Sequence, residues 1–207
     1  MSAPTIRPLG PGEAEEACHL LGLAFAGNPS SLAVARGDRA RAVRTTERSV
    51  RAVKLGGGFS HVLVAERRGR LLGVLNAVPW PHCQMTLGEQ VRTAPAMARV
   101  LGSALPRALT MTRARARHDP RQAHWHLGPI GVHPDHQGEG LGGALLGAFL
   151  ARADREGTPA FLETDVDRNV VLYERFGFQV IARQDILAID TRFMWRPPVT
   201  PDASSRS

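Results

Sequence analysis

One short segment constrains the fold of this chain more than any other part of the sequence. An apolar run over 124–132 ends at His133-Pro134, and a glycine-rich loop follows it. The stretch 141–155 then has apolar residues at helical spacing. The loop carries four glycines within six positions: Gly138, Gly140, Gly142 and Gly143. This pattern predicts a strand, a tight loop and a helix in direct succession.

The glycine loop also predicts a chemistry. Glycines have no side chains, so neighbouring backbone N–H groups can converge on one ligand. The first N–H groups of a helix lack partners within the helix, and the helix dipole makes that end positive. We therefore predict a phosphate-binding loop. A tight packing turn is the alternative reading of the same glycines.

Two familiar phosphate patterns can be compared with this loop. The P-loop needs Gly-Lys-Ser/Thr, and the loop has no lysine. The dinucleotide pattern Gly-x-Gly-x-x-Gly is matched by Gly138, Gly140 and Gly143, and Glu163 follows near a predicted strand end. This alternative predicts a nucleotide-dependent oxidoreductase. Against it, residues 133–137 separate the loop from its strand, and too little chain follows for a full dinucleotide fold.

A third pattern, Gln/Arg-x-x-Gly-x-Gly/Ala, is matched by Gln137, Gly140 and Gly142. A second motif, NVVLYERFGF, follows over 169–178. With both motifs the sequence resembles the GNAT acetyltransferase superfamily, and within it enzymes of the puromycin N-acetyltransferase type. The resemblance implies transfer of acetyl from acetyl-CoA to an amine. It also implies an α/β (α+β) fold, with a mostly antiparallel sheet, a splayed central strand pair and helices on both faces.

The resemblance implies a set of residues that contact acetyl-CoA. The N–H of Ile130 would face the thioester carbonyl, Val132 would pair with pantetheine, and 137–143 would hold the pyrophosphate. The complete set is Ile130, Gly131, Val132, Gln137, Gly138, Glu139, Gly140, Leu141, Gly142, Gly143, Asn169 and Tyr173.

Three side chains are candidates for catalysis. Tyr173 is the only tyrosine, and the matching family residue protonates the departing CoA thiolate. His126 matches a position where some members carry a carboxylate base, and strict alternation places it on the strand face of Ile130. Glu163, at the end of the next strand, is the other candidate base. For His126 and Glu163, a structural role or a water-relayed proton path stays open.

The net charge of +7 and the pI near 11.0 could indicate a nucleic-acid surface. However, Lys54 is the only lysine, so the arginines indicate a codon bias, and no aromatic residues interleave with them. We predict no specific nucleic-acid partner. A non-catalytic module that binds acyl-CoA is the remaining alternative. The sequence shows no membrane span and no secretory signal, so we predict a cytoplasmic protein.

Histidine and cysteine spacing gives little sign of a metal. The pairs His124/His126 and His133/His136 have no third cluster beside them in the sequence, so we predict no metal site. Cys18 and Cys83 lack a pairing or metal spacing and are predicted to be buried thiols in a reducing compartment.

We predict one acetyltransferase domain over 1–198 and a flexible tail over 199–207. The resemblance implies an acceptor site against the first two helices and 80–121. The apolar side chains there suit a small organic amine or a peptide end equally well: Phe25, Trp80, Met85, Met97 and Met111. A small-molecule amine is favoured, and the resemblance leaves a homodimer open. Predicted helices cover 12–25, 39–55, 89–102, 105–117, 141–155 and 170–176; predicted strands cover 5–8, 61–65, 71–78, 124–132, 160–164, 178–182 and 186–189.

Overall fold

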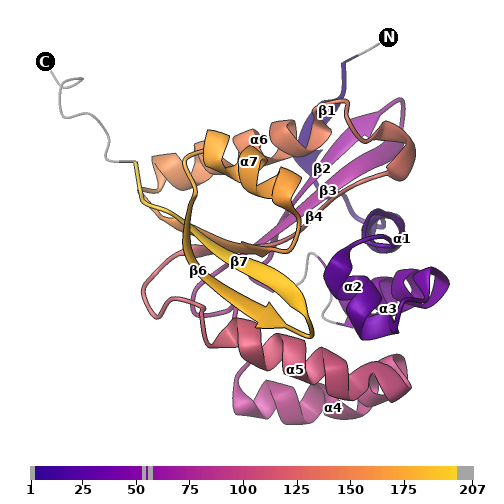
Figure 1. Ribbon diagram of the computed structural model, residues 1–207. Coiled ribbons are helices and arrows are strands. Elements are labelled where there is room, and N and C mark those ends of the chain that lie inside the picture. The colour runs from indigo at the N-terminus through magenta and orange to yellow at the C-terminus, as the bar shows by residue number, and fades with distance from the viewer. Residues whose placement is uncertain (1–2, 53–54, 56–57, 200–207) are drawn as a thin grey trace, which may run out of the picture.

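The computed structural model describes residues 3–52, 55 and 58–199 (Figure 1). The predicted tail therefore lies outside the described residues, apart from Val199. The strands are β1 (Thr5–Pro8), β2 (His61–Arg67), β3 (Arg70–Pro79), β4 (Trp125–Val132), β5 (Ala160–Thr164), β6 (Gln179–Ile186) and β7 (Ile189–Arg196). The helices are α1 (Ala14–Ala24), α2 (Pro29–Ala35), α3 (Arg39–Ala52), α4 (Leu87–Leu101), α5 (Leu105–Ala116), α6 (Leu141–Arg155) and α7 (Asp167–Arg175).

The strands form one sheet in the order β1-β2-β3-β4-β5-β7-β6. Every neighbouring pair is antiparallel except β4 and β5, which are parallel. These two strands pair only at Trp125 with Ala160 and at His126 with Phe161, and then separate. The predicted mostly antiparallel sheet with a splayed central pair is confirmed. It is not the parallel sheet that a dinucleotide-binding oxidoreductase would need.

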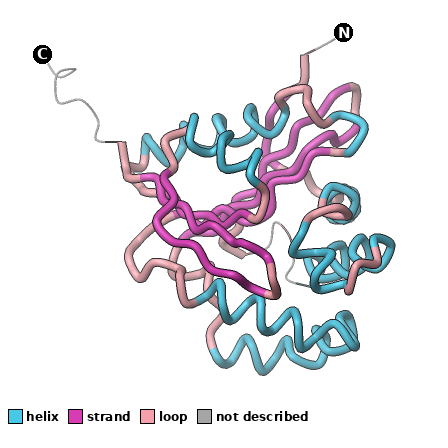
Figure 2. The backbone as a smooth tube through the Cα atoms, in the orientation of Figure 1, coloured by secondary structure: helices cyan, strands magenta, loops and turns pink. Residues whose placement is uncertain are grey.

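Helices cover both faces of the sheet, as predicted (Figures 1 and 2). Side chains alternate between the faces: Leu63 and Ala65 of β2 pack in the core beneath α6 and α7, whereas Val62 and Val64 pack against α1. A third cluster joins Phe161 and Phe193 to α5. Among the described residues, no helix is long and apolar enough to cross a membrane.

Sequence analysis did not predict α2. The Asn28 side chain accepts hydrogen bonds from the N–H groups of Ser30 and Ser31 and so caps this helix, with Pro29 in its first turn. The predicted strand over 186–189 instead spans a hairpin turn, with Leu187 and Ala188 in the left-handed region. Apolar residues on both sides of the turn made it resemble one strand.

A β-bulge in β4 changes the predicted direction of His126. Ala77 pairs with Leu127 but Leu75 pairs with Ile130, so β4 has one extra residue between these positions. The bulge reverses the alternation: Ile130 packs with the core beneath α6, whereas His126 contacts Phe161 on the opposite face. The prediction that His126 and Ile130 share a face is therefore wrong, and Gly128-Pro129 is the local cause.

The close approach of α1 to β4 depends on Gly131. A Cβ at Gly131 would lie 2.8 Å from Cδ2 of Leu21 and 2.9 Å from Cβ of Ala24. We expect Gly131→Ala to lower the free energy of unfolding by about 1–3 kcal/mol, because α1 must shift. Urea denaturation measures the effect. Gly88→Ala is the control, since a Cβ there meets no atom within 4 Å; equal stability of both variants would contradict this packing.

Candidate active site

The glycine loop between β4 and α6 forms an open cradle at the start of the helix. Gly138 and Gly140 have φ of +88° and +80°, a region that favours glycine, and Gly140 is the N-cap of α6. A Cβ at either position would meet no atom within 4 Å. The start of α6 therefore has open space in front of the N–H groups that lack partners within the helix. An anion such as a pyrophosphate can bind at such a place.

The other predicted loop residues have distinct places. The Gln137 amide donates to the Val132 carbonyl at 3.3 Å. Glu139 is paired with Arg67 at 2.9 Å and with His136 at 2.8 Å. Leu141 is buried in the core, so only its backbone is available to a ligand. A Cβ at Gly143 would contact Leu172 and Phe176 at 3.9 Å, so this position faces α7. A Cβ at Gly142 would instead contact Val132 of β4 at 3.8 Å.

The separation of β4 and β5 opens the sheet beside this loop. Ile130, Gly131 and Val132 lie on the part of β4 that has no partner on β5. Asn169 and Tyr173 lie one helical turn apart on α7 and so share a face. Tyr173 is 8% exposed and packs edge-to-face on Phe178. Burial, together with the nearby charge of Glu163, raises the pKa of Tyr173 to about 12.

Glu163 and His126 form an ion pair on the α5 side of the sheet. Nε2 of His126 lies 3.2 Å from Oε2 of Glu163, and Nη1 of Arg115 lies 3.6 Å from Oε1. Burial alone would raise the pKa of Glu163, but the charges of His126 and Arg115 lower it. Burial would lower the pKa of His126, but Glu163 and Asp119 raise it well above its usual value. Nδ1 of His126 lies against Asp119 and Nε2 lies against Glu163, so neither ring nitrogen is free to take a proton from an amine, and His126 is a poor base.

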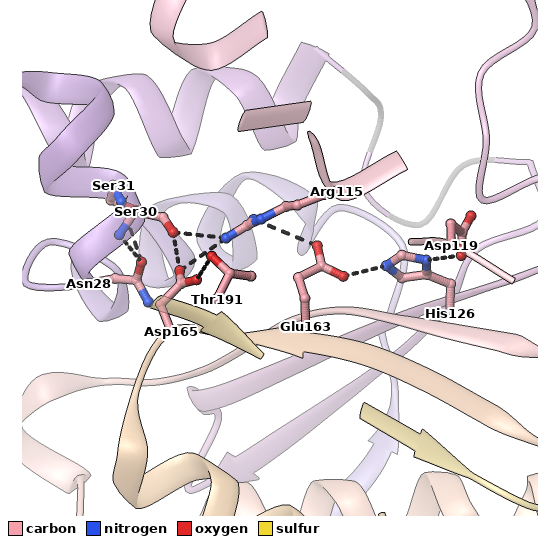
Figure 3. Close-up of polar contacts among 9 residues, drawn as sticks. All are labelled: Asn28, Ser30, Ser31, Arg115, Asp119, His126, Glu163, Asp165 and Thr191. Carbon is pink, nitrogen blue, oxygen red and sulfur yellow. Dashed lines mark hydrogen bonds and ion pairs between the residues drawn. The ribbon is translucent and has the colours of Figure 1, made fainter. Parts of the chain in front are cut away.

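A line of polar contacts continues from this pair to the N-terminus of α2 (Figure 3). Nη2 of Arg115 donates to Oγ of Ser30 at 2.8 Å and contacts Asp165 at 3.0 Å. Oγ1 of Thr191 donates to Asp165 at 2.7 Å. Sequence analysis did not single out any of these residues. The only available signal was the Asn28-Pro29-Ser30 cap that brings α2 to the sheet.

The sequence of this site agrees with one family throughout. The model of the acetyltransferase (GNAT) family matches residues 36–178, which is more than half of the chain. The chain belongs to this acetyltransferase family. The match includes β4, the glycine loop, α6 and α7 up to Phe178. The likeness to puromycin N-acetyltransferases in particular stays a prediction.

Solved structures share the GNAT fold. A Corynebacterium glutamicum protein named "histone acetyltransferase HPA2 and related acetyltransferase" has 24% identity and a TM-score of 0.71, covering 98% of this chain and 100% of that one. A GNAT acetyltransferase from Brucella melitensis in complex with acetyl-CoA has 23% identity and a TM-score of 0.52, covering 96% and 91%. A polyamine N-acetyltransferase from Drosophila melanogaster has 17% identity and a TM-score of 0.59, covering 93% and 98%.

The predicted acceptor region is only partly exposed. Met111 is buried in the cluster beneath α5 and serves the core, whereas 38% of Trp80 and 42% of Met85 are exposed. Phe25 is half-buried against α1 and the sheet.

The fold also gathers a group of side chains that spacing did not predict. Cys83 and Asp119 come together with the His124/His126 pair at the start of β4.

Proposed function

We propose that this GNAT family member transfers the acetyl group of acetyl-CoA directly to a primary amine, with Tyr173 as general acid. One observation carries the proposal: β4 and β5 separate beyond His126, where the unpaired part of β4 leads into the glycine cradle and β5 carries Glu163, whose charge acts on Tyr173. Acetyl-CoA supplies an activated acetyl thioester. The free backbone groups of Ile130 and Val132 would bind its pantetheine arm as an added strand would.

The two ends of the reaction need different proton carriers. An ammonium group with a pKa near 10.4 must lose a proton before its nitrogen can attack a carbonyl carbon. We assign this step to the Glu163 carboxylate, directly or through one water, and assign His126 to hold Glu163 in place. The departing sulfur gains a proton from the Tyr173 hydroxyl, which stays protonated because its pKa is about 12.

We propose a small cationic amine as acceptor. Glu163 offers a carboxylate beside the reaction centre, and its contacts with His126 at 3.2 Å and Arg115 at 3.6 Å are longer than those of Asp165 with Thr191 at 2.7 Å and Arg115 at 3.0 Å. The Drosophila polyamine N-acetyltransferase, which shares the fold, is named for acceptors of this kind. A peptide N-terminus is the competing acceptor.

Two free cysteines, Cys18 and Cys83, suit a reducing cytoplasm as the place of action.

Isothermal titration with acetyl-CoA, and with NADH in a parallel cell, tests the donor. We expect binding of acetyl-CoA alone. A thiol reagent that detects released CoA then measures the rate of acetyl transfer to each candidate acceptor. The panel is a polyamine, agmatine, an aminonucleoside and a short peptide with a free N-terminus. Turnover of the peptide alone would reject the small-molecule acceptor. Binding of acetyl-CoA without turnover of any amine would favour a non-catalytic module.

Backbone conformation at Gly140 gives a separate prediction. A side chain with a Cβ costs about 1–2 kcal/mol in the left-handed region, so a mutant loop would leave the cradle conformation. We expect Gly140→Val to raise the Kd for acetyl-CoA by roughly 5–30-fold, because binding must restore that conformation. Gly157→Val is the control at the opposite end of α6, where φ is +59°. Equal Kd values for both variants would place the pyrophosphate elsewhere.

A further inference from the structure

Four side chains with metal-binding atoms meet beside the start of β4. Cys83 comes from the turn after β3, Asp119 from the bend after α5, and His124 and His126 from the entry to β4. The four donor atoms all lie within 4.8 Å of one another. Oδ1 of Asp119 lies 3.1 Å from Nε2 of His124 and 3.2 Å from Nδ1 of His126, and Oδ2 lies 3.6 Å from Sγ of Cys83. Zinc bonds of about 2.0–2.3 Å in a tetrahedron separate ligand atoms by roughly 3.3–3.8 Å.

Both imidazoles are oriented in the way that metal ligands require. Nδ1 of His124 lies 2.8 Å from the Gln122 carbonyl oxygen, and Nε2 of His126 lies 3.2 Å from a carboxylate oxygen of Glu163. These oxygens can only accept, so each outer nitrogen carries the hydrogen. In a neutral ring the inner nitrogen then offers a lone pair. A histidine whose outer N–H is held by a carbonyl or carboxylate is the usual arrangement around protein-bound zinc.

The inward-facing atoms are shielded from water, because His124 is 1% and Asp119 8% exposed. Without a cation, hydrogens on the inner histidine nitrogens bind the Asp119 carboxylate. A metal ion bound at this point replaces those hydrogens. One divalent cation bound to a thiolate and a carboxylate gives a neutral centre. The Gln84 amide, 2.7 Å from Oδ2 of Asp119, fixes the carboxylate without using Oδ1.

We propose that Cys83, Asp119, His124 and His126 bind one zinc ion through Sγ, a carboxylate oxygen, Nε2 and Nδ1. One sulfur, two nitrogens and one oxygen suit Zn²⁺, whereas Mg²⁺ and Ca²⁺ prefer all-oxygen sites. Four protein ligands leave no open position, so the zinc is structural. It ties the turn after β3 and the bend after α5 to β4. The sequence analysis predicted no metal because Cys83 lies far from the histidine pair along the chain, and Asp119, five residues before His124, was not considered as a ligand.

Metal content and cobalt spectra test this site on the full chain, independently of acetyl transfer. We expect about one zinc per chain by mass spectrometry of the purified protein, and a lower Tm after chelation. Cobalt(II) added to the metal-free protein should give the strong visible bands of tetrahedral coordination and a thiolate charge-transfer band. Cys83→Ser should remove the charge-transfer band, and His124→Gln should lower the zinc content well below one.

Cys18→Ala is the matched control, because it removes the other free thiol from a place away from this cluster. It should leave the zinc content and the cobalt spectrum unchanged. Titration of the wild-type protein keeps the test decisive if a ligand variant does not fold. An octahedral cobalt spectrum without charge transfer, or zinc retained in full by a folded Cys83→Ser, His124→Gln double variant, would overturn the proposal.

Discussion

Tyr173→Phe is expected to reduce kcat by about 10²–10⁴-fold, the range for loss of a positioned general acid. The substitution removes only the hydroxyl, so the ring can still pack on Phe178 within the core. Titration should therefore find nearly unchanged affinity for acetyl-CoA. Because the pKa of Tyr173 is raised to about 12, the hydroxyl stays protonated through neutral and mildly alkaline pH. The wild-type rate should show no alkaline limb from this group below about pH 11.

A change of leaving group separates proton donation from packing. In an acetyl thioester of a more acidic thiol, the thiolate departs without needing a proton. With such a donor, the ratio of the wild-type rate to the Tyr173→Phe rate should therefore fall toward one. A structural defect would slow both donors equally. Full activity of the variant with acetyl-CoA would remove Tyr173 from the mechanism.

Short-range patterns in the sequence were enough to predict the glycine loop and the helix that follows it. Glycines at Gly138 and Gly140 have a local conformational reason, and an amphipathic helix follows them directly. The splayed central strand pair followed only from the family resemblance. Helix α2 was missed because Asn28-Pro29 can end one helix or begin another, and the choice depends on contacts with Arg115 and Asp165.

The site on the other face of the sheet depends on long-range contacts. The bulge near Gly128-Pro129 shifts the alternation of β4, and a count of two residues per repeat could not show it. His126 therefore faces Glu163 and Asp119 rather than the face of Ile130. Cys83 and Asp119 reach the histidine pair only because β3 and α5 deliver their following turns to the start of β4. Asp119 lies only five residues before His124, but the spacing along the chain gives no sign that Cys83 joins them.

Glu163→Gln is expected to reduce kcat by about 10²–10⁴-fold, because an amide cannot take a proton from the attacking amine. The amide oxygen can still accept a hydrogen bond from Nε2 of His126, so stability should change little. Since the pKa of Glu163 is lowered, the carboxylate is ready to accept a proton at all pH values above the ordinary carboxyl range. Its own acid limb in the wild-type rate should therefore lie below about pH 4.5.

Separate measurements of kcat and KM decide what Glu163 does. If it only attracts a cationic acceptor, Glu163→Gln raises KM and leaves kcat unchanged, and the assignment as base is wrong. Glu156→Gln is the matched control, because that carboxylate pairs with Arg152 and Trp125 at the far end of α6. It should keep full activity. Loss of activity in both variants would show a general electrostatic effect on the sheet, whereas loss in Glu163→Gln alone, confined to kcat, places the proton transfer at the separation of β4 and β5.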